Sequence, residues 1–231
     1  MSFQKILIAN RGEIAIRIMR AANDLGIQTV AIYSEDDATS LHRTIADESF
    51  ALPGRGVPAY LDMDTIIDAA KEMNCDAVHP GYGFLAENSE FAKKCNEQNL
   101  TFIGPDVEHL ELFGNKGRAR AAATAAGVPI LKGIDRSVSV EEAKEFFSSL
   151  GANAGMMIKA VAGGGGRGSR AVTEELEIEE TFKRCQSEAT SAFGNGELYV
   201  EEFIQQARHI EVQILGDKSG NIINLGEREC S

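Results

Sequence analysis

Short apolar runs alternate with stretches of helical periodicity in the first half of the chain. Residues 6–9 form a continuous apolar run, which is typical of a parallel strand buried on both faces. Apolar residues then recur at helical spacing between residues 14 and 25, and residues 29–33 form the next apolar run. A strand, a helix and another strand in this order predict a right-handed crossover within a parallel sheet.

The same alternation continues to about residue 113. It predicts strands at 49–52, 77–78 and 101–103 and helices at 65–73 and 88–98, the second of which is capped by Asn88. Residues 1–113 are therefore expected to form a doubly wound α/β domain with a parallel sheet. The segment 79–85 follows a strand at the carboxyl edge of this sheet, where open α/β sheets bind ligands.

Two polar segments at the same edge have simpler interpretations. The turn after the first strand contains one glycine and lacks the dinucleotide fingerprint, so Arg11 and Glu13 are expected to pair locally at the start of the helix. The acidic residues 35–37 are expected to form a solvated loop.

A smaller unit follows the first domain. Residues 114–130 contain an alanine-rich connecting helix that is closed by Gly127. The pattern of residues 131–203 predicts a helix, two strands around a glycine loop, another helix and a final strand. A unit of this size is typical of a lid subdomain. Residues 204–231 predict two strands joined by a short turn, and a lone hairpin of this kind is marginal in water.

A run of four glycines, Gly163, Gly164, Gly165 and Gly166, lies between the two strands of the lid. Glycine loses more backbone entropy on ordering than any other residue, but without Cβ atoms successive N–H groups can converge on one anion. The flanks contain Lys159, Arg167 and Arg170 and match neither a Walker A loop nor a dinucleotide fingerprint. The pattern predicts a flap that closes over a phosphate group; a flexible surface hairpin is the alternative.

Lys116 is a second candidate for phosphate binding. It stands at the start of the connecting helix, where exposed N–H groups and the positive end of the helix dipole favour an anion. The alternative is an ordinary surface lysine near a helix cap.

Net charge and cysteine spacing limit the classes of ligand and partner that the protein is expected to bind. The net charge of −12 opposes non-specific binding to nucleic acid or to an anionic membrane, so an anionic ligand needs a local cationic pocket. The four cysteines have no CxxC spacing and no histidine at zinc-ligand spacing, which indicates free thiols. The sequence has no long apolar run and no signal segment, so a cytoplasmic protein is expected.

Several motifs are distributed over the whole chain in a fixed order. They are Asn10-Arg11-Gly12-Glu13-Ile14-Ala15, segment 79–85, Phe102-Ile103-Gly104-Pro105, Asn115-Lys116, loop 159–170, Val200-Glu201-Glu202-Phe203, Arg208-His209-Ile210-Glu211-Val212-Gln213 and Glu227-Arg228-Glu229-Cys230-Ser231. In residues, order and spacing this set resembles the biotin carboxylase family, the ATP-grasp component of biotin-dependent carboxylases. Agreement over the whole chain is more specific than any single loop.

The resemblance implies an architecture and a nucleotide site. The doubly wound domain would be the pre-ATP-grasp domain, followed by the ATP-grasp lid and by a truncated start of the C-terminal ATP-grasp subdomain. Lys116 and Lys159 would contact the ATP phosphates, and the amides around Gly165 and Gly166 would close over them. The residues that would read the adenine edge or line the nucleotide site are Glu201, Glu202, Phe203, Ile204 and His209. Family members often have methionine where this chain has Ser169.

The resemblance also implies a reaction and its partners. Bicarbonate would attack the γ-phosphate of MgATP to give carboxyphosphate, and the carboxyl group would pass to N1′ of biotin on a carboxyl carrier domain or protein. A carboxyltransferase would use the carboxybiotin, and the family commonly forms homodimers. The Mg²⁺ ligands, the bicarbonate-binding residues and a catalytic arginine are expected in a region after Ser231.

The chain is therefore expected to be an N-terminal fragment of a carboxylase and to be inactive alone. Two alternatives stay open. Another ATP-grasp ligase, such as a carbamoyl-phosphate synthase half, shares the bicarbonate-phosphorylating step. A non-catalytic nucleotide-binding module is the other, although the intact Lys116 and Lys159 argue against a degenerate site.

Overall fold

The computed structural model describes residues 3–151, 154–162, 168–217 and 219–230, with the backbone but not the side chain of Lys116. The chain forms two compact units, Met1–Ala119 and Arg120–Ser231. In the described part, no helix has the length and apolarity needed to cross a lipid bilayer.

The first unit is built on a parallel sheet with the strand order β3-β2-β1-β4-β5. Its strands are β1 (Lys5–Ile8), β2 (Gln28–Tyr33), β3 (Glu48–Ala51), β4 (Ala77–His79) and β5 (Thr101–Phe102). Its helices are α1 (Gly12–Asp24), α2 (Leu41–Ile45), α3 (Gly56–Ala59), α4 (Met63–Glu72), α5 (Ser89–Glu97) and α6 (Val107–Gly114). The prediction of a doubly wound α/β fold is confirmed.

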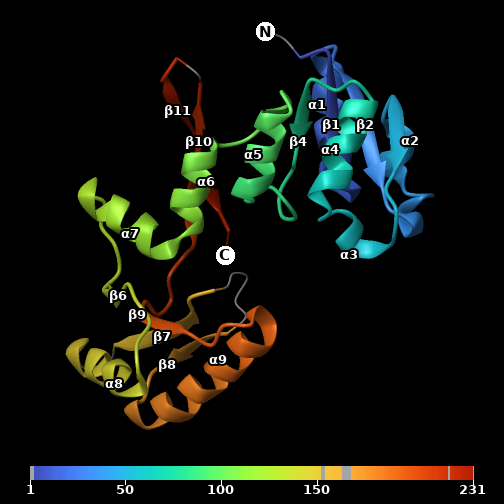
Figure 1. Cartoon of the computed structure of the whole chain (residues 1–231). Coiled ribbons are helices and arrows are strands. Elements are labelled where there is room, and N and C mark those ends of the chain that lie inside the picture. Colours follow the sequence, from blue (N-terminus) through green and yellow to red (C-terminus); the bar gives the residue numbers. More distant parts are fainter. Residues whose placement is uncertain (1–2, 152–153, 163–167, 218, 231) are drawn as a thin grey trace. The chain divides into compact units, whose positions relative to one another are not determined.

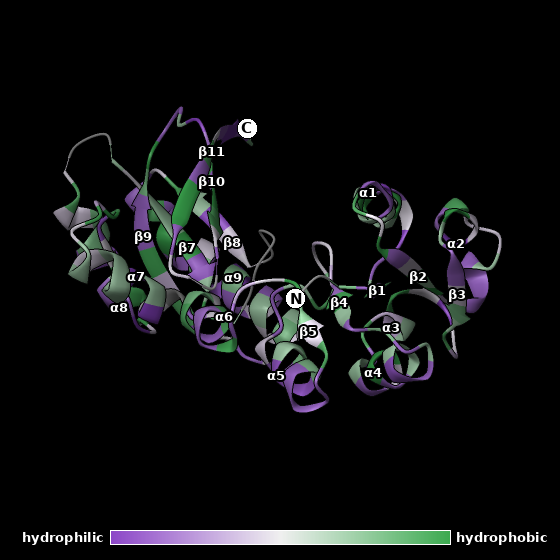
Figure 2. Cartoon of the chain, turned by 90° about the horizontal axis from the view of Figure 1, so that it is seen from above, coloured by the Kyte–Doolittle hydropathy of each residue, from purple (hydrophilic) through white to green (hydrophobic). Residues whose placement is uncertain are grey.

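The central strands are buried on both faces, as their continuous apolar runs predict. Ile6 and Ile8 pack with α1 in one cluster, while Leu7 packs with α4 and α5 in another. Figure 2 shows α1 and α2 on one side of this sheet and α3 and α4 on the other. Because successive side chains of β1 point to opposite faces of the sheet, this strand contributes to two separate apolar cores.

The second unit contains an antiparallel sheet with the strand order β6-β9-β7-β8. Its strands are β6 (Gly133–Ile134), β7 (Gly155–Ala160), β8 (Ser169–Val172) and β9 (Leu198–Phe203), and its helices are α8 (Val140–Ser149) and α9 (Ile178–Phe193). Both helices pack on one face of this sheet, where Met156, Ile158 and Val200 are fully buried (Figure 1). Helix α7 (Lys116–Ala125) spans the boundary between the two units.

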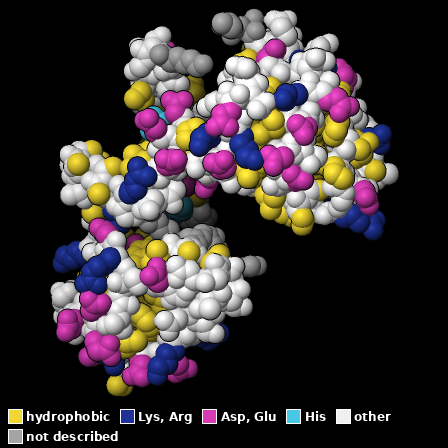
Figure 3. All heavy atoms as spheres, in the orientation of Figure 1, with side chains coloured by type: hydrophobic (Ala, Val, Ile, Leu, Met, Phe, Trp, Pro, Cys, Tyr) yellow, Lys and Arg dark blue, Asp and Glu magenta, His cyan; other side chains and the backbone are white. Residues whose placement is uncertain are grey.

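A two-stranded sheet, β10 (Ile210–Gly216) and β11 (Ile222–Glu229), forms the end of the described chain. The hairpin agrees with the sequence-based expectation of two strands joined by a short turn. Many of its apolar side chains are exposed, including Val212, Ile214, Leu215, Ile222, Ile223 and Leu225. Acidic and basic side chains are interspersed on the visible face of each unit (Figure 3).

Three short elements escaped prediction from the sequence, namely α2, α3 and β6. Each is five residues long or shorter. A segment of this length carries less than two turns of helical periodicity and no clear alternation, so tertiary contacts rather than local pattern define it.

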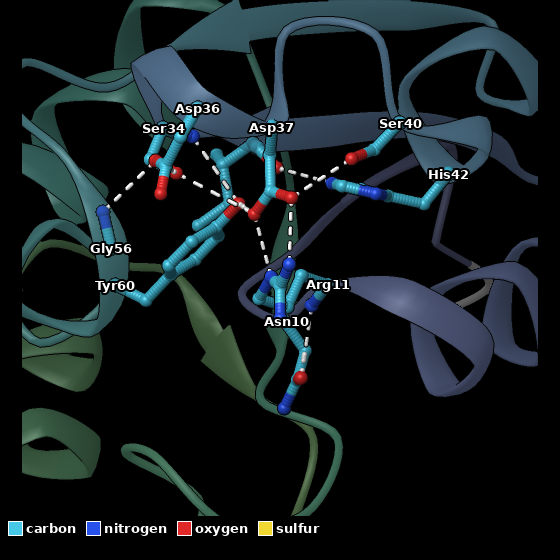
Figure 4. Close-up of polar contacts among 10 residues, drawn as sticks. Asn10, Arg11, Ser34, Asp36, Asp37, Ser40, His42, Gly56 and Tyr60 are labelled. Carbon is cyan, nitrogen blue, oxygen red and sulfur yellow. Dashed lines mark hydrogen bonds and ion pairs between the residues drawn. The ribbon is translucent and has the colours of Figure 1, made fainter.

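In the acidic segment after β2, Asp37 lies in a buried polar cluster, contrary to the expectation of a solvated loop, whereas Glu35 and Asp36 are exposed as expected. Asp37 is only 6% exposed and lies in the 3₁₀ turn Glu35–Asp37. Arg11 donates to both of its carboxylate oxygens at 2.6 Å, and Ser40 and the Tyr60 hydroxyl donate at 2.8 Å (Figure 4). Arg11 therefore pairs across the sheet edge rather than locally, because a carboxylate needs several donors once it is buried.

Asn10 ties together the loops that follow β1 and β4. Its side-chain amide donates to the carbonyl oxygens of Pro80 and Tyr82, each at 2.8 Å. A Cβ atom at Gly81 would lie 2.7 Å from the Asn10 Nδ2 atom. Asn10 thus fills the edge between β1 and β4, where the strand order reverses and where doubly wound folds usually bind ligands.

Replacing Asp37 by asparagine should destabilise the first unit by about 2 kcal/mol, because charge-assisted bonds to Arg11 are lost. Arg11 holds the pKa of the Asp37 carboxyl well below its usual range. The carboxylate therefore stabilises the fold above its unfolded pKa of about 3.9, and this contribution is lost as the pH falls further. Urea unfolding followed by circular dichroism should give a difference between wild type and Asp37→Asn that is full at pH 7 and shrinks below about pH 4.

Glu35→Gln is the matched control, since Glu35 is exposed and its ion pair with Arg55 spans 3.7 Å. It should change the unfolding free energy by less than about 0.5 kcal/mol. Equal effects of the two substitutions, or a pH-independent effect of Asp37→Asn, would contradict a stabilising role of the ionised Asp37 carboxylate.

Ser139→Ala should lower the stability of the lid unit by about 1 kcal/mol. Ser139 caps α8 in a reciprocal capping box: its side chain accepts from the amide of Glu142 and its own amide donates to the Glu142 carboxylate. Ser148→Ala in the same helix is the control, because the Ser148 hydroxyl donates only to the Lys144 carbonyl within the helix. Thermal unfolding should separate the two variants, and a Ser148 variant that is equally destabilised would remove the capping argument.

Candidate functional site

The strands on either side of the glycine loop are joined at the base of the loop. The Ala160 amide donates to the Gly168 carbonyl at 2.9 Å, and Gly168 has a φ of +64°. A Cβ atom there would lie 3.2 Å from Ala160 Cβ, so the close approach of the chain favours glycine. The four glycines predicted to bind phosphate, Gly163, Gly164, Gly165 and Gly166, lie outside the described residues, as does Arg167.

The register of the sheet places Lys159 on the face opposite the helices. Lys159 pairs with Ser169 on β8 and with Tyr199 on β9, and directly opposed residues share a face. Its neighbour Ile158 is fully buried under α8 and α9. The Lys159 side chain, which is 30% exposed, therefore stands on the outer face of the lid sheet, next to the start of the loop.

Lys159 and Glu201 form an ion pair on this outer face. The Glu201 side chain is only 15% exposed, so the carboxylate is not an ordinary solvated surface charge. Glu202 opposes Met156, a core residue, and thus belongs to the other face. This is the alternation of side chains expected along a β-strand.

Tyr199 is the cross-strand partner of Lys159 and lies on the same face of β9 as Glu201. Burial and then the charge of Glu201 raise its pKa to about 12, so the hydroxyl is neutral at physiological pH. Arg120 of α7 forms an ion pair with Asp135, and its Nη2 atom donates to the Leu131 carbonyl at 2.7 Å. Tyr199, Arg120 and Asp135 were not predicted as site residues. For Tyr199, alternation with Glu201 along β9 was an available signal.

Glu201, Glu202 and Phe203 are the last residues of β9, and Ile204 follows it. A Cβ atom at Gly155 would lie 2.8 Å from Phe203 Cδ1, so the aromatic ring packs closely over that glycine. Ile204 is 51% exposed. The segment predicted to read the adenine edge is therefore the end of a strand, in which the Glu202 amide donates to the Lys132 carbonyl at 2.8 Å.

His209 and Lys116 belong to other segments. His209 precedes β10; its Nε2 atom lies 3.2 Å from a Glu211 carboxylate oxygen, and its carbonyl accepts from the Cys230 amide. Lys116 is the first residue of α7, and its side chain lies outside the described part of the structure. Asn115 caps this helix by accepting from the Arg118 amide at 3.0 Å.

Arg170 does not belong to the candidate phosphate site, contrary to the sequence-based expectation. It opposes Ile158 on the helix-covered face, and its guanidinium donates to Glu188 of α9 at 2.6 Å. Among the described side chains, no three histidine, cysteine, aspartate or glutamate residues gather in an arrangement that could hold a metal ion. The charges that act near Lys159 and Tyr199 form two ion pairs, Lys159 with Glu201 and Arg120 with Asp135.

Two families match the chain in succession. Residues 2–110 match the biotin carboxylase N-terminal domain, and residues 115–231 match the ATP binding domain of the carbamoyl-phosphate synthase L chain. The pyruvate carboxylase of Staphylococcus aureus (strain Mu50 / ATCC 700699) is 53% identical over 231 residues, which are 99% of this chain and 20% of that protein. The 2-oxoglutarate carboxylase small subunit of Hydrogenobacter thermophilus is 47% identical over 230 residues, 99% of this chain and 48% of the relative.

Solved structures agree with these relatives. The biotin carboxylase domain dimer of the Hydrogenobacter thermophilus 2-oxoglutarate carboxylase, in complex with MgADP, ADP and bicarbonate, has a TM-score of 0.93 and 47% identity and matches 100% of this chain and 51% of its own. A biotin carboxylase–β,γ-ATP complex from Campylobacter jejuni has a TM-score of 0.93 and 43% identity, over 100% and 52% of the two chains. This chain thus spans about a fifth to a half of the relatives it matches. It belongs to the biotin carboxylase family, as its N-terminal domain followed by sequence of the ATP-binding domain.

Proposed function

We propose that the protein containing this chain is an ATP-dependent biotin carboxylase. Bicarbonate would take the γ-phosphoryl group of MgATP, giving carboxyphosphate and ADP. The carboxyl carbon would then bond to N1′ of protein-linked biotin as its bond to the phosphate oxygen breaks, with release of inorganic phosphate and of the N1′ proton. The observation that carries this proposal is the placement of Lys159 on the outer face of the lid sheet, directly before the glycine loop, in a chain of this family. An ammonium group beside successive backbone amides suits a polyphosphate.

In this proposal the chain's own residues bind the nucleotide. Lys116, Lys159 and the amides of the loop 163–166 bind the phosphates, and the end of β9 with Ile204 reads the adenine edge through its backbone. His209 completes the nucleotide site. The lid excludes water from the labile carboxyphosphate.

Mg²⁺ bound together with ATP would supply neutralisation of the phosphate charge. The described acidic residues do not form a cluster that fits the ion, so the proposal assigns no magnesium ligand to them. We divide the chain into an N-terminal domain (1–113), a connecting helix (114–130), a lid subdomain (131–203) and the start of the C-terminal ATP-grasp subdomain (204–231).

The partners and the location are proposals of the same kind. They comprise bicarbonate, a biotin carboxyl carrier, a carboxyltransferase and a second copy of the protein in a homodimer, in the cytoplasm and without nucleic acid or membrane. The structural relative from Hydrogenobacter thermophilus is a dimer with MgADP, ADP and bicarbonate, which supports the homodimer and the anionic ligands.

A carbamoyl-phosphate synthase half is the second candidate, because residues 115–231 match an ATP binding domain that bears that name. The two candidates share bicarbonate phosphorylation and differ in the acceptor of the carboxyl group. The match of residues 2–110 to a biotin carboxylase N-terminal domain favours the first candidate over the second and over a non-catalytic nucleotide-binding module.

Calorimetric titration of MgATP and of ADP tests the nucleotide site. Lys159→Ala should weaken binding roughly tenfold or more, since a charge-assisted phosphate contact is lost. Lys144→Ala is the control: Lys144 lies in α8 and its ion pair with Glu179 spans 3.4 Å. Equal affinities of wild type and Lys159→Ala would remove Lys159 from the site.

Turnover assays test the chemistry. In the complete protein, ATP cleavage should require bicarbonate and should rise on addition of biotin. The 231-residue chain alone, which spans about half of the related biotin carboxylase chains, should show no such turnover. ATP cleavage that responds to ammonia and not to biotin would favour the carbamoyl-phosphate synthase candidate instead.

A further inference from the structure

The lid unit has a pocket between the second half of α9 and the loops that precede α8 and β9. Its volume is about 350 Å³, in the lower part of the range for small-molecule sites. Leu198, which lines it, opposes Ala160 on β7 and packs in the core under the helices. Side chains alternate along a strand, so this face is opposite the one that carries Lys159. The pocket is therefore separate from the candidate nucleotide site.

The inner wall of this pocket is apolar and is held in place by the backbone. Val138, Phe182 and Leu198 line it and are all buried. The Val138 amide donates to the Leu198 carbonyl at 2.9 Å, which joins the loop before α8 to the start of β9. An aliphatic chain placed against this wall would leave water without any need for the protein to rearrange.

Glu197 stands at the exposed rim of the pocket, in a loop of defined conformation. The Asn195 side chain accepts from the Glu197 amide at 2.9 Å and donates to a Glu197 carboxylate oxygen at 3.2 Å. A Cβ atom at Gly196 would collide with the Thr190 hydroxyl, so glycine lets this loop pack directly on α9. A carboxylate can accept more bonds than the one from Asn195, and the Glu197 charge is thus held where it can meet a cation.

The end of α9 adds negative potential to the same rim. The helix runs from Ile178 to Phe193, and Thr190, in its last turn, lines the pocket. Carbonyl groups at a helix C-terminus favour a cation, yet the last turn of α9 contains no basic residue. Arg136, in the loop before α8, is engaged by the Glu142 carboxylate and the Ser137 carbonyl.

We propose that this pocket binds a primary ammonium group on a short aliphatic chain. The chain lies against Phe182, and the ammonium lies at the rim, between Glu197 and the end of α9. A free alkylamine and a lysine side chain share this chemistry, because the lysine stem is apolar and its tip is charged. A carboxylate ligand of the same length would be repelled by both negative features, and a neutral ligand would gain only the apolar contact.

Titration of the complete protein with n-butylammonium, followed by NMR of the ligand, tests the pocket. We expect a Kd on the order of 1 mM for a ligand of this size. n-Butanol and butyrate carry similar chains without the positive charge and should bind more weakly by about fivefold or more, since they lack the attraction to Glu197 and to the helix end.

Two variants, each with a matched control, place the ligand. Glu197→Gln should weaken n-butylammonium binding about fivefold, whereas Glu180→Gln, in the first turn of α9, should stay within about twofold of wild type. Gln186→Trp places a large ring on an exposed helix position that lines the pocket and should weaken binding roughly tenfold. Ser187→Trp, at the next exposed position and outside the lining, should bind as wild type does. Unchanged circular dichroism melting would show that each variant is folded.

Nα-acetyl-lysine methylamide distinguishes the two sources of the ammonium group. Tighter binding of this blocked lysine than of n-butylammonium assigns the pocket to a protein side chain, and equal or weaker binding assigns it to a free amine. The proposal is overturned if n-butylammonium shows no saturable binding, if butyrate binds equally well, or if Glu197→Gln or Gln186→Trp keeps wild-type affinity. None of these results bears on the proposed nucleotide site, which lies on the other face of the sheet.

Discussion

The antiparallel register of β7 with β8 and β9 is the constraint on which the candidate site depends. Because side chains alternate along a strand, the pairing of Ile158 with Val200 commits one face to α8 and α9 and turns Lys159 and Glu201 to the other. A shift of one residue would bury the ammonium under the helices and expose the core. Burial of apolar side chains on one face therefore fixes the position of the charges on the other.

Most of the fold follows from local pattern, and the exceptions have physical reasons. The continuous apolar run of β1 and the helical periodicity of α1 define a parallel α/β unit without reference to the structure. The short helix α2 and the two-residue strand β6 carry too little pattern to be predicted. Their existence depends on contacts with segments distant in sequence, which a local reading does not include.

The site was less predictable than the fold. Lys159 was singled out from its position before the glycine run, but its partner Glu201 lies 42 residues further along, and only the strand register brings them together. Arg170 was misassigned because charge next to the loop was considered without regard to the face on which it falls. Asp37 was misjudged because an acidic run resembles a solvated loop until its donors, Arg11 and Tyr60, are known.

Asn10 changes what the first domain can do with its own architecture. The edge between β1 and β4, where folds of this type hold small molecules, contains an amide supplied by the chain itself, and Gly81 makes room for it. The arrangement of the loops after these two strands is thus set by hydrogen bonds within the chain itself and needs no ligand to hold it.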